Sequence, residues 1–136
     1  MKKINVGIAG FGLSGQTFHA PIIRTVPGME IRKVVSSSPR KVNQQLPNVE
    51  VVADFEDLLS DESIDLVVIT TPNQTHYPFA KQSLLAGKHV VVEKPFVISS
   101  KEARDLIETA RRQNKLLSVY QNRRWDNDFF DCQELH

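Results

Sequence analysis

The chain is 136 residues long, 40% hydrophobic and 24% charged, and its formal net charge at pH 7 is +1. These values fit one globular domain with a substantial core, and they argue against a basic nucleic-acid binder or an acidic disordered tail. The single cysteine, Cys132, rules out an internal disulfide, and no apolar run is long enough to cross a membrane. We therefore expect a cytoplasmic protein without a nucleic-acid partner, a membrane partner or a metal site.

The first stretch, "MKKINVGIAGFGLSG", combines two lysines with apolar residues and so imitates a signal peptide. Asn5 interrupts the apolar part, four glycines follow it, and no small-residue cleavage site is evident. A first strand over residues 4–9 that enters a glycine loop accounts for the same residues better.

The glycine loop comes directly after this strand. Its glycines have the G-x-G-x-x-G spacing, which permits a tight turn, close approach of the backbone to a pyrophosphate, and close packing of helix on strand. The N-terminus of the next helix then attracts phosphate. A purely structural turn is the alternative, but the position between an N-terminal strand and a helix favours dinucleotide binding. The predicted loop residues are Gly10, Phe11, Gly12, Leu13, Ser14 and Gly15. Pro21 should break the following helix near His19.

The second predicted strand, residues 30–35, should end at the adenosine ribose. An acidic residue normally contacts that ribose, but the chain has "SSSPRK" there, and Glu30 lies at the wrong end of the strand. Serines leave room for a 2′-phosphate and donate to it, and two cations add favourable charge. The same residues also fit a polar turn in which Ser38 caps a short helix begun by Pro39. We predict NADP rather than NAD as the coenzyme, bound by Ser36, Ser37, Ser38, Arg40 and Lys41.

Further strands are predicted over residues 49–52, 65–70, 89–92 and 116–120, with helical patterns between them. Consecutive apolar residues in "LVVI" and "HVVV" indicate strands that are covered on both faces. Asn73 and Gly87 are the predicted N-cap and C-terminal stop of one helix, and Ser99 with Glu102 forms a capping box for the next. The predicted fold class is therefore α/β, a doubly wound parallel sheet of the Rossmann type.

The fourth strand ends in "TTPNQTH", at the edge of the sheet where ligands of doubly wound folds bind. Small hydroxyl side chains and a rigid proline can border a flat ring without filling its space. His76 is predicted to meet a ribose or phosphate, with an exposed histidine in an ordinary turn as an equal alternative. The predicted coenzyme contacts here are Thr70, Thr71, Pro72, Asn73 and His76.

The fifth strand runs into "EKPF", which places Glu93 and Lys94 at the reactive end of the coenzyme. A partly desolvated lysine beside a cationic nicotinamide would have a lowered pKa. It could then hold a substrate hydroxyl and manage its proton during hydride transfer. In isolation, such a pair would be a solvated ion pair at a strand end. At this place in the sheet, we predict Lys94 as the catalytic residue, and both Glu93 and Lys94 as coenzyme contacts.

Taken together, "GIAGFGLSG", "ITTPNQTH" and "GKHVVVEKPF" closely resemble the glucose–fructose oxidoreductase, inositol dehydrogenase and rhizopine-catabolism (Gfo/Idh/MocA) family. "HAP" and "QNRRWDNDF" look more like its branch of NADP-dependent scyllo-inositol dehydrogenases. The resemblance implies an N-terminal Rossmann domain followed by a sheet domain that binds a sugar or polyol. It also implies that Glu93 approaches the nicotinamide ribose, that Lys94 contacts the substrate, and that Arg124 and Trp125 reach the coenzyme's edge. The bond before Pro95 would be cis.

On this basis residues 1–121 are the dinucleotide-binding domain, and residues 122–136 begin a substrate domain that is otherwise absent. The family places its proton-accepting histidine in that second domain, and His136 does not match the motif. The expected function is NADP-dependent hydride transfer with a CH–OH group of a sugar, polyol or inositol. The full-length protein would be a homo-oligomer, and this fragment alone would be inactive. Two alternatives stay open: a non-catalytic nucleotide-sensing module, and a short protein whose aromatic C-terminal stretch docks on a partner.

Overall fold

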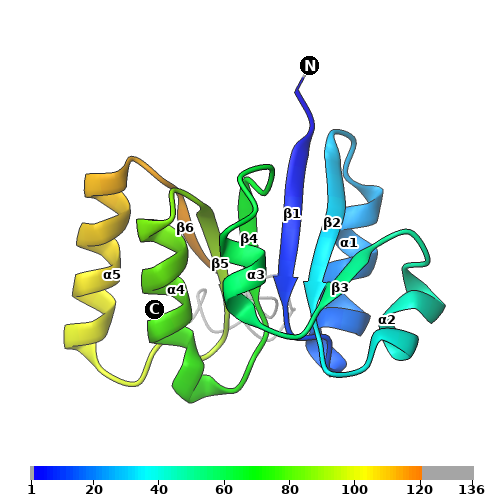
Figure 1. Ribbon diagram of the computed structural model, residues 1–136. Coiled ribbons are helices and arrows are strands. Elements are labelled where there is room, and N and C mark those ends of the chain that lie inside the picture. The colour runs from blue at the N-terminus through cyan, green and yellow to red at the C-terminus, as the bar shows by residue number, and fades with distance from the viewer. Residues whose placement is uncertain (1, 121–136) are drawn as a thin grey trace, which may run out of the picture.

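The computed structural model describes residues 2–120, in which six strands form one parallel sheet in the order β3-β2-β1-β4-β5-β6 (Figure 1). The strands are β1 (Ile4–Ala9), β2 (Met29–Val35), β3 (Glu50–Val52), β4 (Leu66–Ile69), β5 (His89–Glu93) and β6 (Leu117–Tyr120). The predictions for Arg124, Trp125 and residues 122–136 lie outside the described residues.

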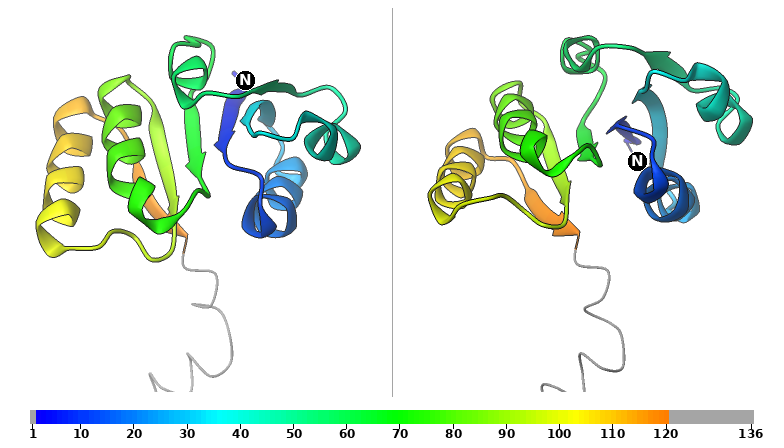
Figure 2. Two further views of the ribbon diagram at one scale, coloured as in Figure 1. Left: turned by 60° about the horizontal axis from the view of Figure 1, so that its bottom comes forward. Right: turned by 90° about the horizontal axis from the view of Figure 1, so that it is seen from below.

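Helical segments connect these strands and lie on both faces of the sheet (Figure 2). They are the π-helical turn η1 (Gly15–His19), α1 (Ala20–Thr25), α2 (Pro39–Gln45), α3 (Phe55–Leu59), the 3-10 turn η2 (Asn73–Thr75), α4 (His76–Leu85) and α5 (Ser100–Gln113). In the part of the chain that the structure describes, no helix is both long enough and apolar enough to cross a membrane.

The core consists of two apolar clusters, one on each face of the sheet. On one face, α1 and α2 contribute Ile23 and Val42 to a cluster with Ile8 of β1. On the other face lie α3, α4 and α5, which contribute Leu58, Leu84 and Leu106. Neighbouring β4 residues, Val67 and Val68, belong to different clusters, which confirms that this strand is buried on both faces.

The order of the strands determines where a ligand can lie. β1 pairs with β2 on one side and with β4 on the other, so the chain winds in opposite directions from the centre of the sheet. The carboxyl ends of β1 and β4 therefore flank the point at which the strand order reverses, which is where doubly wound sheets bind ligands. The Rossmann prediction is confirmed, and every predicted strand is present, with β1 at its predicted bounds.

Pro21 does not break the first helix as predicted. The segment instead passes from η1 directly into α1, and the N–H of Ala20 donates to the carbonyl of Gly15, five residues earlier. Proline lacks an N–H, and its ring crowds the carbonyl four residues before it in an α-helix. The wider π turn changes that register and lets the helix continue through Pro21.

Two of the predicted helix ends are confirmed and one is wrong. The Ser99 hydroxyl accepts the Glu102 N–H at 3.2 Å, and the Glu102 carboxylate accepts the N–H of Ile98, one residue earlier than a standard capping box. Gly87 ends α4 with a φ of 78°, in the left-handed region that favours glycine. Asn73, by contrast, makes no capping hydrogen bond, because a 3-10 turn precedes α4 and Asn73 is its first residue.

Candidate functional site

The glycine loop turns at Gly10, whose φ of 90° is one that side chains rarely tolerate. Its N–H donates to the carbonyl of Val35 at 3.0 Å, which ties the loop to the end of β2. A Cβ at Gly10 would lie 3.0 Å from Thr70 Oγ1 and 3.3 Å from the Thr70 carbonyl oxygen. The fold itself therefore requires a glycine at this position.

Gly12 is different, because a Cβ there would meet nothing within 4 Å. Gly12 is exposed, and its φ is not among the positive values of the described chain. The folded chain therefore gives no internal reason for a glycine at this position. An open backbone at a helix N-terminus is what close approach of a pyrophosphate needs.

Thr70 joins the glycine loop to β4. Its hydroxyl lies 3.0 Å from the carbonyl oxygens of both Ala9 and Gly10, to which it can donate. A Cβ at Gly15 would lie 3.2 Å from the Gly10 carbonyl oxygen and 3.4 Å from Thr70 Oγ1. Gly15 thus allows the helix to pack closely against the loop, while the Thr70 hydroxyl holds the loop by hydrogen bonds from the end of β4.

A hollow of about 370 Å³ opens between the glycine loop and the end of β2. Its wall contains no carboxylate and one cation, Lys41. Its lining residues are Gly10, Phe11, Gly12, Val35, Ser36, Ser37, Ser38, Lys41, Ala53 and Thr71. The structure therefore gathers eight of the predicted coenzyme residues from three separate segments around one space. Arg40 is exposed and does not line it.

The serine segment holds its shape through backbone contacts. The Ser36 N–H donates to the Val52 carbonyl of β3 at 3.0 Å, and the Ser36 hydroxyl accepts the Ser38 N–H at 3.1 Å. Ser38 occupies the N-cap position of α2, with Pro39 next, but its side chain makes no capping hydrogen bond. The side chains of Ser37 and Ser38 are exposed at the mouth of the hollow.

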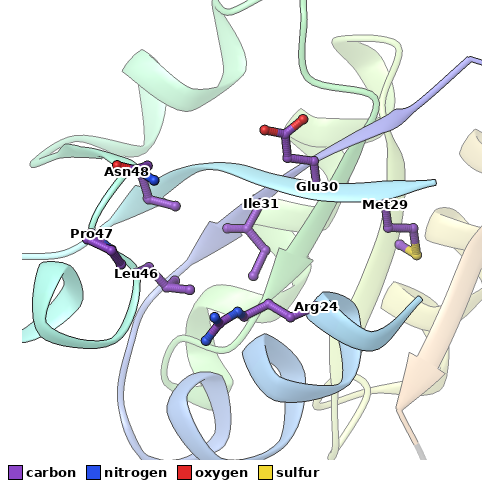
Figure 3. A pocket seen from close by; sticks show the side chains of 8 residues that line it. Arg24, Met29, Glu30, Ile31, Leu46, Pro47 and Asn48 are labelled. Carbon is purple, nitrogen blue, oxygen red and sulfur yellow. The ribbon is translucent and has the colours of Figure 1, made fainter. Parts of the chain in front are cut away.

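A second hollow, of about 300 Å³, lies at the opposite end of the strands, where β2 and β3 begin (Figure 3). Arg24 reaches into it from the end of α1, below Ile31 and Leu46. We assign the coenzyme to the first hollow, since the second lies away from the glycine loop and from the carboxyl ends of the strands.

Glu93 turns inward at the end of β5. The Ser14 hydroxyl donates to Glu93 Oε2 at 2.5 Å, and His19 Nε2 lies 2.5 Å from the same oxygen. Because a carboxylate only accepts, that nitrogen of His19 carries a proton. The side chains of His19 and Glu93 are only 5% and 14% exposed. Within the described residues, no ion pair joins Glu93 to Lys94, so the surface pair is not what the structure contains.

Tyr120 completes this cluster from the end of β6. Its ring lies against the ring of His19, with centroids 4.4 Å apart. Burial, followed by the charge of Glu93, raises the pKa of the Tyr120 hydroxyl. His19 is not among the site residues predicted from the sequence. The sequence feature that could have indicated a role for His19 is its position directly before Ala20, on the side of the helix that faces the sheet.

His76 is 1% exposed and links two loops at the site. Its Nδ1 lies 2.7 Å from the carbonyl oxygen of Pro95, and its Nε2 lies 2.9 Å from that of Thr71. A neutral imidazole has a single N–H, so it can donate to only one of these carbonyls. This geometry favours a positioning role for His76 at the ends of β4 and β5, and the predicted contact with a ribose or phosphate stays a prediction.

The remaining predicted residues lie along the same edge of the sheet. The Thr71 hydroxyl is hydrogen-bonded to that of Thr75, while Pro72 and Asn73 are exposed at the start of η2. Lys94 is exposed immediately after β5, and the Lys94–Pro95 bond is cis, as predicted. Leu13 is 78% exposed beside the loop. Over residues 2–120, no three His, Cys, Asp or Glu side chains group closely enough to hold a metal ion.

The site fits a dinucleotide on the evidence of its own residues. Gly12 presents bare backbone to the space, and the adjoining wall is rich in hydroxyls, carries Lys41 and lacks carboxylates. Such a wall favours an anion. This hollow, at the strand ends flanking the reversal point, is suited to the phosphate-bearing half of a nucleotide coenzyme.

Comparison with known proteins gives the same result. A family model described as "Oxidoreductase family, NAD-binding Rossmann fold" (Gfo/Idh/MocA) matches residues 4–121. The uncharacterized oxidoreductase YdgJ of Escherichia coli K12 is 48% identical over 133 residues, which cover 98% of this chain and 38% of that protein. The scyllo-inositol 2-dehydrogenase (NADP(+)) IolW of Bacillus subtilis 168 is 42% identical over 132 residues, which cover 97% of this chain and 37% of that protein.

A solved structure agrees in fold. The NAD-binding protein from Listeria innocua superposes with a TM-score of 0.86 at 34% identity, covering 98% of this chain and 40% of that one. The chain thus spans less than half the length of the relatives that it matches. The match over residues 4–121, together with these identities, shows that the chain belongs to the Gfo/Idh/MocA oxidoreductase family.

Proposed function

We propose that this chain is the coenzyme-binding part of an NADP-dependent oxidoreductase. The reaction would be hydride transfer between nicotinamide and a CH–OH group of a sugar, polyol or inositol. The observation that carries the proposal is that the backbone of Gly12 is uncovered and borders the serine-lined hollow. The NADP(+)-dependent inositol dehydrogenase named among the relatives supports both the coenzyme and the substrate class.

The preference for NADP rests on the hollow at the end of β2. Ser36, Ser37 and Ser38 would donate to a 2′-phosphate, and Lys41 would supply charge within the wall. Arg40, exposed one residue away, would approach the same phosphate from the rim. The lining contains no carboxylate. A carboxylate there would repel the 2′-phosphate and would accept a hydrogen bond from a 2′-hydroxyl.

The reactive end would lie at the ends of β4 and β5. The coenzyme supplies the hydride acceptor when bound, and residues 70–73 would border its ring. Lys94, exposed there, would hold the substrate hydroxyl and take part in its proton transfer. Glu93 would act close to the nicotinamide ribose while fixed by Ser14 and His19. Arg124 and Trp125 would complete the coenzyme's edge.

The parts of the protein beyond this domain are also proposed. Residues 1–121 would form the coenzyme domain and residues 122–136 the beginning of a substrate domain. That domain would contribute the proton acceptor and the substrate specificity. A homo-oligomeric full-length protein and a cytoplasmic location remain predictions. The alternative of a nucleotide-sensing module needs no lysine at the reactive end, so exposed Lys94 favours the enzyme.

The test is a fluorescence titration of the 136-residue chain with NADPH and NADH. NADPH should bind more tightly. Ser37→Asp should weaken NADPH binding by about tenfold, equivalent to 1.4 kcal/mol, because it adds a negative charge beside the 2′-phosphate. Ser100→Asp, which adds the same charge at the start of α5, is the control and should change nothing. Equal affinity for both coenzymes in every variant would refute the NADP assignment, and absence of binding would refute the coenzyme domain itself.

A further inference from the structure

The turn after β5 holds Lys94 between two residues that are fixed by buried histidines. On one side, Glu93 Oε2 lies 2.5 Å from His19 Nε2. On the other side, the carbonyl oxygen of Pro95 lies 2.7 Å from Nδ1 of the buried His76. The Lys94 side chain itself is exposed. The place of its ammonium group therefore depends on the backbone from which the side chain extends.

The Glu93 carboxylate connects His19 to that backbone because both of its oxygens are used. Oε2 accepts from His19 Nε2 and from the Ser14 hydroxyl, each at 2.5 Å. Oε1 accepts the backbone N–H of Lys94 at 3.3 Å. The two oxygens belong to one planar group, whose last torsion is otherwise broad in glutamate. Bonds to Oε2 therefore also restrict Oε1, and with it the N–H of Lys94.

The π turn η1 brings the two donors to one oxygen. Ser14 directly precedes η1 and His19 is its last residue, five positions later. In an α-helix with 3.6 residues per turn, side chains five positions apart point about 140° away from each other. The π turn instead hydrogen-bonds residues five apart, as Ala20 does with Gly15, and so brings Ser14 and His19 closer to one side. Such turns are frequent at functional sites.

Packing leaves the His19 ring little freedom. The ring is 5% exposed, and the ring of Tyr120 lies against it with centroids 4.4 Å apart. Tyr120 is also the neighbour of Glu93 across the β5–β6 pairing. A donor whose own rotamer is fixed by packing can hold its partner in one geometry, as a mobile surface side chain cannot.

We propose that His19 is a positioning residue for Lys94: through Glu93, it fixes the turn that presents the ammonium group at the reactive end. The proposal rests on the function proposed above, because it takes Lys94 as the group that holds the substrate hydroxyl. His19 acts through Glu93 and takes no part in the proton transfer. A displacement of about 1 Å at a reacting group can lower a rate by about 100-fold. A long, exposed side chain therefore needs a fixed backbone.

The first measurement is the NMR order parameter of the Lys94 amide in the isotopically labelled chain. We expect about 0.85 in the wild type and less than about 0.6 in His19→Phe, which keeps an aromatic ring but removes the donor. His89→Phe is the matched control. His89 is the first residue of β5, at the opposite end of the strand, and its Nδ1 accepts the Leu116 N–H at 3.0 Å. This variant should leave the Lys94 value unchanged.

A pair of amide variants tests the reach of the donor. In His19→Gln, the side-chain nitrogen can lie about where imidazole Nε2 lies, so it can still donate to Glu93. In His19→Asn, the side chain is one methylene shorter and the nitrogen falls short. The first variant should restore the order parameter of Lys94, and the second should behave like His19→Phe. This comparison also serves if His19→Phe does not fold, and circular dichroism verifies folding of every variant.

The second measurement is turnover of NADP+ and scyllo-inositol by a protein that carries the second domain. His19→Phe should lower kcat by at least about tenfold while the Kd of NADPH changes by less than about threefold, because the substitution displaces Lys94 rather than the coenzyme. His19→Gln should recover most of kcat. Lys94→Ala, measured beside them, tests the proposed function itself.

Two results would overturn the positioning role. One is a Lys94 order parameter that is the same in wild type, His19→Phe and His19→Asn, or that falls equally in His89→Phe. The other is an unchanged kcat in the His19 variants when Lys94→Ala abolishes turnover. Failure of the proposed function would look different. Lys94→Ala would then keep the turnover of the wild type, or the wild type would not oxidise scyllo-inositol, while the order parameter still supported the link through Glu93.

Discussion

Replacing Gly12 by alanine is expected to abolish coenzyme binding and to leave the fold intact. The added Cβ meets nothing within 4 Å, so the free energy of unfolding should change by no more than about 0.5 kcal/mol. The same methyl group occupies the space through which a pyrophosphate must approach the backbone. NADPH affinity should therefore fall by at least about tenfold, or 1.4 kcal/mol.

Gly10→Ala is the comparison that makes this prediction specific. At a φ of 90°, with Thr70 Oγ1 only 3.0 Å from the new Cβ, alanine is strained and crowded. The left-handed conformation alone costs about 1–2 kcal/mol, and the contact adds to that cost. Urea unfolding and NADPH titration on both variants provide the measurement. If Gly12→Ala binds NADPH normally, or unfolds as easily as Gly10→Ala, the assignment of Gly12 to coenzyme binding is refuted.

Three further outcomes are expected. His19→Phe should lower the free energy of unfolding by about 2 kcal/mol, because Glu93 loses a charge-assisted hydrogen bond. Adding Glu93→Gln to this variant should recover part of that loss. If the two substitutions have strictly additive effects on the free energy of unfolding in urea, the pairing of His19 with Glu93 is contradicted. Hydrogen bonds from the Lys33 ammonium, the larger cause, and from Ser63 hold the pKa of Asp61 well below its usual range. Ionised Asp61 therefore stabilises the folded state above pH ~4, and this stabilisation is lost as the pH falls through the folded-state pKa. Thermal unfolding from pH 5 to pH 2 should thus show a smaller decrease for Lys33→Met than for the wild type, and parallel curves would contradict the ion pair. Lys94→Ala, in a protein that carries the second domain, should abolish turnover with NADPH affinity nearly unchanged, and unchanged turnover would remove its catalytic role.

Much of the fold could be predicted because it depends on local patterns. The apolar runs of β4 and β5 are characteristic of strands buried on both faces, and the glycine spacing after β1 determines the type of connection that follows. Gly87 could be predicted as a helix end because its left-handed φ suits glycine. The serine segment could be connected with the glycine loop because parallel strands align their carboxyl ends.

The contacts that shape the site could not be predicted in the same way. Glu93 bonds to Ser14 across 79 residues of sequence, and His76 bonds to the carbonyl of Pro95 across 19. The "EKPF" motif alone does not reveal whether its carboxylate faces water or the glycine loop. The continuous helix at Pro21 likewise depended on a π turn, which apolar spacing does not indicate. Long-range partners decided the first two cases, and the local hydrogen-bond register of the backbone decided the third.

The most direct test of the coenzyme assignment is to map backbone amide chemical shifts of the isotopically labelled chain during titration with NADPH. The largest saturable changes are expected at Gly12, Ser37 and Thr71, which surround the hollow at the carboxyl ends of the strands. Changes centred on Ile31 and Asn48, at the opposite hollow, or no saturable change at all, would contradict the account.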